Sequence, residues 1–305
     1  MLNDLPGLLV TKDIALVLFV MSTMLSIGLS VNLKQIKGIL SNYKLMTKGL
    51  LANFLIIPLV AWIIVQVIPM DKSISTGFLL VSVCAGAALG PKFAQMAKSD
   101  IALAATMMFI LSVLTAFITP FWLGVFFGSA GDSTSSDGFT TPSNHTSRIL
   151  IELIILYLVP MLLGILINNR YPDRVKIRTL LEKVSTILLI VVAAIVLMTN
   201  LSDIYQYIVG TLGIIISLVS VMIYGTLGYI LGGPRISTKR SLAFDTAIRN
   251  DAVALLIATQ SFSDQPNVAV VVVVFGLTQI IVMGVMAYYW SKKSKGSEIK
   301  ASIKG

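Results

Sequence analysis

The chain has 305 residues, of which 56% are hydrophobic and 12% are charged, and its mean hydropathy is +0.91. Soluble domains carry about a quarter of charged residues, so this composition excludes a soluble globular protein and fits a chain that is solvated by lipid. The formal net charge of +9 suits a nucleic-acid partner. The basic residues follow a topology pattern instead, and we expect no nucleic-acid binding. The sequence predicts a single all-α integral membrane domain over residues 1–305.

The chain holds one cysteine, Cys84, and one histidine, His145. A disulfide within the chain is therefore excluded, and zinc, haem and Cys/His catalysis lack ligands or a nucleophile–base pair. Cys84 lies in an apolar run and is expected to be a small packing residue. We expect no enzyme and no bound cofactor. The first apolar run follows no cationic segment, so we expect a retained helix rather than a signal peptide.

A membrane-spanning helix needs about 20 mostly apolar residues, and apolar runs of this kind follow one another along the whole chain. The predicted spans are 11–31, 46–69, 73–97, 101–128, 149–168, 181–200, 205–232, 241–262 and 267–290. The connections are short except for a polar loop at 129–147. This loop contains the glycosylation sequon Asn144-His145-Thr146, which we interpret as part of a solvated outer loop.

The basic residues predict the orientation of the spans, because Lys and Arg concentrate in cytoplasmic loops. With the N-terminus outside, Lys12, Lys72 and Arg148 fall on the outer side and Lys92 and Arg249 fall within spans, whereas the other 18 of the 23 lie inside. This asymmetry supports about nine spans in a plasma or inner membrane, with residues 291–305 as a cytoplasmic tail.

The third span contains a helix break at Gly90-Pro91. Proline lacks the backbone N–H and disfavours helix in the residue before it, but it suits the first turn of a new helix. We predict a helix that ends near Gly86–Gly90 and a second that starts at Pro91. A kinked but continuous helix is the alternative.

The eighth span contains Asp245, Arg249, Asn250 and Asp251 within an apolar stretch. Asn250 and Asp251 are good N-cap residues for a half-helix that begins at Ala252. Asp245 and Arg249 are four residues apart and can pair on one helix face. Charged residues at this depth mark a pathway or site by default, although a structural pair that holds the helices together is the alternative.

The two interrupted spans have opposite orientations, which is typical of inverted-repeat secondary transporters with a site at the midplane. Half-helix N-termini and fixed cations there attract an anion. We therefore predict a site for a small, carboxylate-like organic anion at the crossing. The candidate substrate-binding residues are Lys92 and Arg249 for charge, Asn53, Asn250, Thr278 and Gln279 for hydrogen bonds, and Gly90 and Pro91 at the break.

Three motifs resemble those of the bile acid:sodium symporter family over essentially the whole chain. They are Asn53-Phe54 ahead of Pro58 and Trp62, the segment Cys84–Pro91 followed by Met96–Leu103, and Phe244–Asn250. The resemblance implies a core domain from 43–128 and 205–290 that moves against a panel from 11–31 and 147–200. It implies alternating access and two discontinuous helices that cross.

The family binds two sodium ions beside the crossing, and the resemblance places their ligands at positions that here hold poor ligands. These positions are Gly90, Pro91, Ala104, Met108, Asp245 and Arg249. A guanidinium offers donors only, so we interpret Arg249, paired with Asp245 and helped by Lys92, as a built-in substitute for sodium. The candidate ion-coupling or charge-pair residues are Asp245, Arg249, Asn53 and Asp251. The sequence predicts no metal site with the usual sodium ligands.

The favoured function is a secondary transporter of a small organic anion that works by alternating access. Its coupling is left open between exchange, protons carried by Asp245 or Lys92, and none. A sodium-coupled organic anion symporter of the usual family type is one alternative, and a passive anion channel is another. An enzyme and a scaffold or receptor are disfavoured, since no catalytic set is visible and charged residues within spans would have no role in a scaffold.

Overall fold

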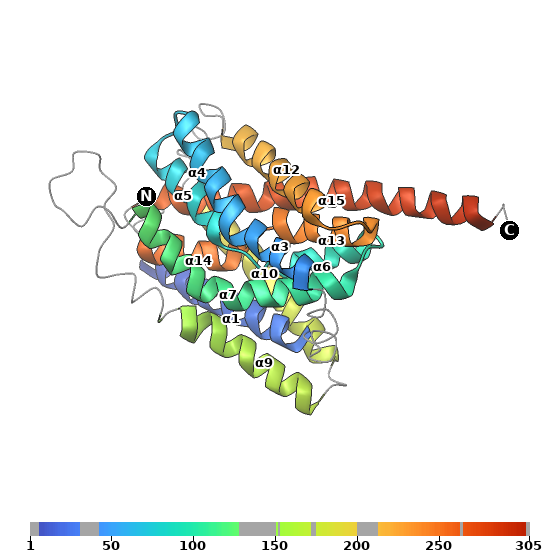
Figure 1. Ribbon diagram of the computed structural model, residues 1–305. Coiled ribbons are helices and arrows are strands. Elements are labelled where there is room, and N and C mark those ends of the chain that lie inside the picture. The colour runs from blue at the N-terminus through green and yellow to red at the C-terminus, as the bar shows by residue number, and fades with distance from the viewer. Residues whose placement is uncertain are drawn as a thin grey trace.

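The computed structural model describes residues 6–30, 43–127, 151, 153–171, 175–199, 213–262 and 265–302. Within this part of the chain every regular element is a helix and none is a strand (Figure 1). The predicted all-α class is confirmed. The loop with His145 and the Asn144 sequon lies outside the described residues.

The helices lie roughly side by side in one bundle (Figure 1). Their bounds are α1 (Pro6–Ser30), α3 (Tyr43–Leu51), η1 (Ala52–Ile56), α4 (Ile57–Val67), α5 (Lys72–Val83), α6 (Leu89–Met96), α7 (Ile101–Phe127), η3 (Ile154–Leu158), α9 (Val159–Arg170), α10 (Val175–Thr199), α12 (Gly213–Leu231), α13 (Ile236–Ala247), α14 (Asp251–Ser261) and α15 (Pro266–Ser302). The labels η1 and η3 mark short π-helical turns.

Several helices are long and apolar enough to cross a membrane. Among the described residues these are Tyr43–Val67, Ile101–Phe127, Ile177–Val196, Gly213–Leu231 and Asn267–Ser294. Three shorter apolar helices overlap other predicted spans, namely Ile14–Ser30, Lys72–Val83 and Ile154–Arg170. The chain is therefore a multi-pass membrane protein, and the count of nine spans stays a prediction. The helix α15 continues to Ser302, so residues 291–302 of the predicted tail are helical, and their cytoplasmic location stays a prediction.

Large apolar side chains cover outward faces of the bundle. Leu162 and Leu166 on α9 are exposed, as are Ile187 and Ile190 on α10. Exposing apolar surface of this kind to water is unfavourable. Lipid acyl chains around these faces avoid that free-energy cost. Several polar side chains are buried instead, among them Asn53, Asp245 and Arg249, which is the arrangement that a lipid solvent favours.

The third and eighth predicted spans are both broken. The helix α5 ends at Val83 and α6 begins at Leu89, whereas α13 ends at Ala247 and α14 begins at Asp251. The kinked, continuous alternative is therefore wrong for the third span.

The first break lies earlier in the chain than predicted. Pro91 is the third residue of α6 rather than its first. Proline is tolerated there because the first four N–H groups of a helix have no intrahelical acceptor. In the second break, Asn250 is the N-cap as predicted, and its Oδ1 accepts a hydrogen bond from the Val253 N–H at 3.3 Å.

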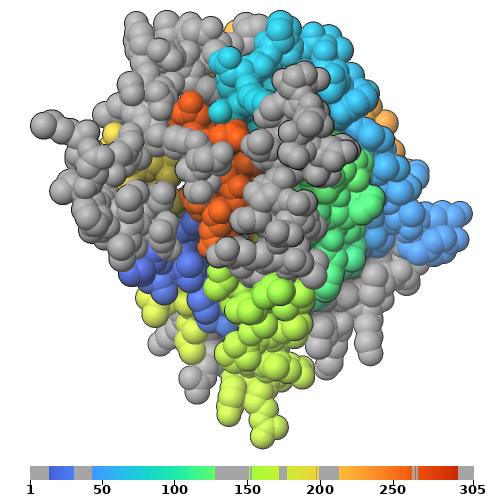
Figure 2. All heavy atoms as spheres, turned by 90° about the vertical axis from the view of Figure 1, so that its left-hand side faces the viewer, coloured from blue at the N-terminus to red at the C-terminus, as the bar shows by residue number. Residues whose placement is uncertain are grey.

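Two groups of helices meet along α14. The helices α1, α9 and α10 form one group, because α1 makes its most extensive contacts with α9 and α10. The other helices pack around α5, α7, α12, α13 and α15, and α14 contacts both α1 and α15. In Figure 2 the orange surface at the α14 end of the molecule lies between the blue and yellow-green of α1 and α9 and the cyan and green of α5 and α7.

Glycines allow α1 and α9 to approach closely. A Cβ atom added at Gly28 would collide with the backbone carbonyl of Met161 and lie 2.9 Å from the Cα of Gly164. A Cβ atom at Gly164 would meet the backbone of α1 in the same way. Small residues of this kind are typical of membrane helix interfaces, where close backbone contact provides the association energy.

We expect Gly28→Ala to lower the stability of the purified protein by about 1–3 kcal/mol, because the added methyl group overpacks a backbone contact. Gly124→Ala on α7 is the matched control, since a Cβ atom there would meet nothing within 4 Å. Thermal unfolding in detergent measures both variants. Equal midpoints for the two would show that α1 and α9 are free to separate.

Candidate functional site

The two breaks touch each other through their backbones. The residues at both breaks are extended, with φ and ψ of −90° and 91° at Cys84 and of −86° and 90° at Asn250. The N–H of Asn250 donates a hydrogen bond of 2.8 Å to the carbonyl of Cys84. The side chains of both residues are buried. We call these two unwound segments, 84–88 and 248–250, the crossing.

The first break frees a row of backbone carbonyl groups, and each of them has a partner. The contacts are Arg249 Nη1 to Ser82 at 3.1 Å, Thr119 Oγ1 to Val83 at 3.0 Å, Asn250 N to Cys84 at 2.8 Å, Thr115 Oγ1 to Ala85 at 3.1 Å, Ser112 Oγ to Gly86 at 2.8 Å and Asn250 Nδ2 to Gly86 at 2.9 Å. A buried carbonyl without a partner costs about 1–3 kcal/mol. Because each of these carbonyl groups has a donor, the break avoids this cost in the dry interior.

Three of these donors come from one face of α7. Ser112, Thr115 and Thr119 are spaced by three and four residues, so they line one side of the helix. All three are fully buried. Sequence reasoning missed them, although three hydroxyl residues at helical spacing within an apolar span are a usable signal.

Arg249 lies at the centre of the crossing and is fully buried. Its guanidinium donates to the Ser82 carbonyl and to Asn53 Oδ1. Its backbone N–H donates to Gln279 Oε1 at 2.7 Å, and its carbonyl accepts from Gln279 Nε2 at 3.2 Å. The structure therefore brings together three of the predicted residues, Arg249, Asn53 and Gln279.

Asn250 and Asp251 complete the second break. Asn250 Nδ2 donates to the hydroxyl of Tyr157 at 3.1 Å, and both oxygens of Asp251 accept from Gln279 Nε2 at 2.9 Å. Tyr157 was not predicted, and an isolated tyrosine in the apolar run before Pro160 was its only signal.

Two of the residues that reach the crossing from outside it, Asn53 and Tyr157, share an unusual backbone. Asn53 lies in the π-helical turn η1 and Tyr157 in the π-helical turn η3. A proline follows each turn closely, at Pro58 and Pro160. Proline removes an intrahelical donor, and π-turns are often found where a helix accommodates such a change near a functional site. The local sequence thus positions both polar side chains.

The predicted Asp245–Arg249 pair is wrong. Both oxygens of Asp245 are buried and have no hydrogen-bond partner. The helix α13 ends at Ala247, so the spacing of four residues no longer places the two side chains on one face. Asp245 lies instead beside Gly90, where an added Cβ atom would be 2.6 Å from Asp245 Oδ1.

Lys92 and Thr278 do not join the crossing. Lys92 is half-exposed and forms an ion pair of 3.3 Å with Glu182 of α10. Lys92 therefore places its charge beside the crossing rather than at its centre, because α6 directs its side chain toward the α1, α9 and α10 group. Thr278 is partly exposed, and its hydroxyl donates to Val274 of its own helix at 2.8 Å.

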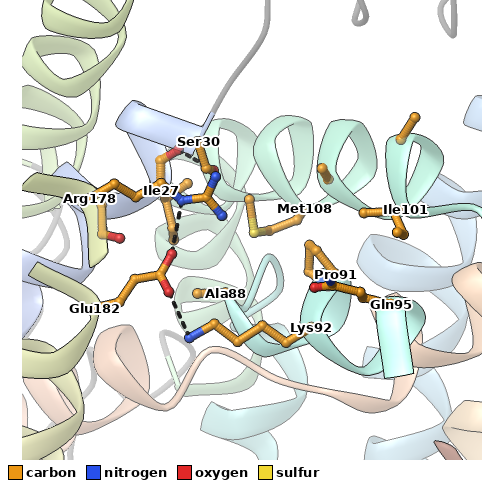
Figure 3. Close-up of a pocket in the computed structure, with 13 residues that line it drawn as sticks. Ile27, Ser30, Ala88, Pro91, Lys92, Gln95, Ile101, Met108, Arg178 and Glu182 are labelled. Atoms are coloured by element: carbon orange, nitrogen blue, oxygen red, sulfur yellow. Dashed lines mark hydrogen bonds and ion pairs between the residues drawn. The ribbon is translucent and has the colours of Figure 1, made fainter. Parts of the chain in front are cut away.

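A cavity of about 350 Å³ lies between α1 and α10 on one side and α6 and α7 on the other. Figure 3 shows that Lys92 and Arg178 both point at the carboxylate of Glu182. Arg178 Nε donates to Glu182 Oε1 at 2.9 Å, and Lys92 Nζ lies 3.3 Å from Oε2. Ala88 of the first break and Pro91 of α6 also line the cavity, so the cavity borders the crossing.

The side chains at the positions where the resemblance places sodium ligands offer few oxygen atoms. Gly90, Pro91, Ala104 and Met108 carry no side-chain oxygen, so Asp245 is the one oxygen ligand among the side chains there. Arg249 fills the remaining position with hydrogen-bond donors. Hard cations need several oxygen ligands. Within the described residues no group of three or more His, Cys, Asp and Glu side chains could hold a metal ion.

An all-helical membrane chain with two broken helices that cross through buried polar groups has the architecture of a secondary transporter. The chain belongs to the sodium bile acid symporter family, whose model matches residues 15–207. This is a family of transporters rather than enzymes, and the resemblance carried by the sequence motifs is confirmed.

The relatives share low identity over most of the chain. The chain is 23% identical to the uncharacterized sodium-dependent transporter YocS of Bacillus subtilis, over 95% of this chain and 87% of that protein. It is 23% identical to the probable sodium/metabolite cotransporter BASS1, chloroplastic, of Oryza sativa, over 93% of this chain and 68% of that protein. It is 21% identical to the probable sodium/metabolite cotransporter BASS1, chloroplastic, of Arabidopsis thaliana, over 89% of this chain and 65% of that protein.

We expect Thr115→Val to destabilise the protein by about 1–3 kcal/mol, because it leaves the buried Ala85 carbonyl without its donor. Thr246→Val is the matched control. Thr246 is equally buried, but its hydroxyl bonds to Leu242 within its own helix at 2.8 Å, so its loss leaves no freed carbonyl unsatisfied. Chemical unfolding of the purified variants measures the difference. An equal loss in both would contradict the role of the α7 hydroxyl groups.

Proposed function

We propose that the chain is a secondary transporter that moves a small organic anion across the membrane by alternating access. The observation that carries this proposal is the cavity beside the crossing. Two cations from different helices, Lys92 on α6 and Arg178 on α10, converge there on one carboxylate. The site is thus already shaped around a carboxylate, which is the group that a carboxylic substrate would present.

The carboxylate of Glu182 holds the place of the substrate in this proposal. It bridges α6, which belongs to the broken third span, and α10, which packs on α1. An incoming carboxylate competes with Glu182 for Lys92 and Arg178. When the substrate carboxylate replaces Glu182, the ion pair between Lys92 and Glu182 that joins the two helix groups is lost. The group that contains the crossing, the core, can then move against α1, α9 and α10, the panel.

This placement moves the anion away from Arg249. The Arg249 side chain is fully buried, and its two terminal nitrogens already bond to Ser82 and Asn53. An anion there would have to displace structural partners. Lys92 and Pro91 line the cavity and remain candidate substrate contacts, whereas Arg249, Asn53, Asn250 and Gln279 support the crossing from within.

The name of YocS marks that relative as sodium-dependent, and the BASS1 names mark those relatives as sodium/metabolite cotransporters. From these names we take a metabolite-sized substrate, and from Lys92 and Arg178 in the cavity we take its negative charge. We propose that this chain transports it without sodium at the crossing, because Arg249 provides a fixed positive charge at the position of a sodium ligand. Asp245, whose oxygens have no partner, is the group that a coupled proton would use.

Counterflow in proteoliposomes tests transport. Vesicles preloaded with unlabelled carboxylates should accumulate a radiolabelled member of the same panel, with saturable rates. Flux that neither saturates nor shows counterflow would indicate the passive anion channel.

We expect Lys92→Gln to raise the KM for the transported anion at least about tenfold, because a charge-assisted hydrogen bond to a carboxylate contributes about 1.5–3 kcal/mol. Glu182→Gln should lower the KM, since it removes the competing carboxylate. Lys183→Gln is the control for charge, because Lys183 neighbours Glu182 on α10 but is exposed outside the cavity. Wild-type KM values in the Lys92 and Glu182 variants would exclude this cavity as the anion site.

A further inference from the structure

A second cavity, of about 400 Å³, lies where α3 begins and where α12 gives way to α13. Three basic residues line it: Lys44 and Lys48 from α3, and Arg235, the N-cap residue of α13. Among the described residues that line it, none is acidic. The cavity is separate from the one that holds Lys92 and Glu182, so an inference about it does not depend on the transport proposal.

The floor of this cavity is a tightly fixed turn. Gly233 has a φ of +79°, in the left-handed region that favours glycine. A Cβ atom at Gly232 would collide with the backbone of Lys239. The buried Thr238 hydroxyl lies 2.6 Å from the Gly232 carbonyl and 2.9 Å from the Arg235 carbonyl. The turn therefore holds the N-terminal end of α13 and Arg235 in place opposite the two lysines.

Membrane topology explains why basic residues gather at one end of the spans. Topology does not require basic side chains from two separate helices to face one cavity. With three cations, no lining carboxylate and a fixed floor, the cavity is electrostatically complementary to a phosphate group.

The face of α3 that bears the lysines identifies the source of that phosphate. Lys44 and Lys48 are followed at helical spacing by Leu51 and Leu55, which are 48% and 45% exposed. One face of the continuous α3–η1 helix thus carries two lysines followed by two exposed leucines. A phospholipid matches this order, with its headgroup at the lysines and its acyl chains along the leucines. A free phosphate ion would make no contact with the exposed leucines.

We propose that this cavity binds the headgroup of an anionic phospholipid. Lys44, Lys48 and Arg235 bind the phosphate, and the chains lie against α3 and η1. Basic pockets at helix ends near the membrane surface are a known way to recognise such headgroups. The bound lipid would fill the space between α3 and the α12–α13 turn.

Lipid titration of the purified, delipidated protein by native mass spectrometry tests the site. The probes are phosphatidylglycerol, phosphatidylcholine and inorganic phosphate. We expect phosphatidylglycerol to bind at least about tenfold more tightly than phosphatidylcholine, and each cation removed to weaken it about fivefold. The pocket variant is Lys44→Gln/Lys48→Gln/Arg235→Gln, and Lys48→Gln alone is a milder variant that keeps most of the charge.

The control variant Lys183→Gln/Lys292→Gln/Lys293→Gln removes the same charge from residues outside the cavity. It should bind phosphatidylglycerol as the wild type does. Equal weakening in the control and pocket variants would overturn the proposal in favour of diffuse attraction. Binding of inorganic phosphate as tight as that of phosphatidylglycerol would assign the cavity to a soluble anion, and no preference over phosphatidylcholine would exclude an anionic site.

Discussion

The constraint on which this structure depends is the need to bond five consecutive carbonyl groups, from Ser82 to Gly86, inside a dry bundle. A helix provides such bonds from its own backbone, and a broken helix within a membrane does not. Here the donors come from the face of α7, from the second break and from Arg249. The two breaks therefore stabilise each other, and neither segment has the same set of partners without the other.

Arg249 has a double role in this arrangement. Its guanidinium bonds to the carbonyl of Ser82 and to Asn53, so it joins the crossing to the π-helical turn of the second predicted span. It also brings a permanent positive charge to a position where the family resemblance expects a sodium ligand. A buried charge is costly unless its hydrogen bonds are satisfied. We infer that this fixed cation takes the place of the sodium ion that the resemblance implies there.

The sequence was sufficient to predict the helical class, the two breaks and the cap at Asn250. These features follow from local rules: apolar run length, the tendency of Pro91 to interrupt a helix and the capping preference of asparagine, although the first helix ends earlier than Pro91 predicts, at Val83. The Asp245–Arg249 pair failed because helical spacing was applied across a residue at which the helix had already ended. The ion pair between Lys92 and Glu182 could not be predicted from the sequence. Glu182 is about 90 residues away in the chain, and tertiary packing decides that α6 and α10 meet.

The crossing and the cavity have different roles. The crossing stabilises the broken backbone, and the cavity presents Lys92 and Arg178, whose carboxylate partner can be exchanged. Thermal unfolding of the purified wild-type protein tests whether Arg249 replaces sodium. The midpoint is compared in sodium chloride and in choline chloride at equal ionic strength, because a ligand of the folded state raises it. We expect equal unfolding midpoints in the two salts. A saturable rise with sodium would contradict it.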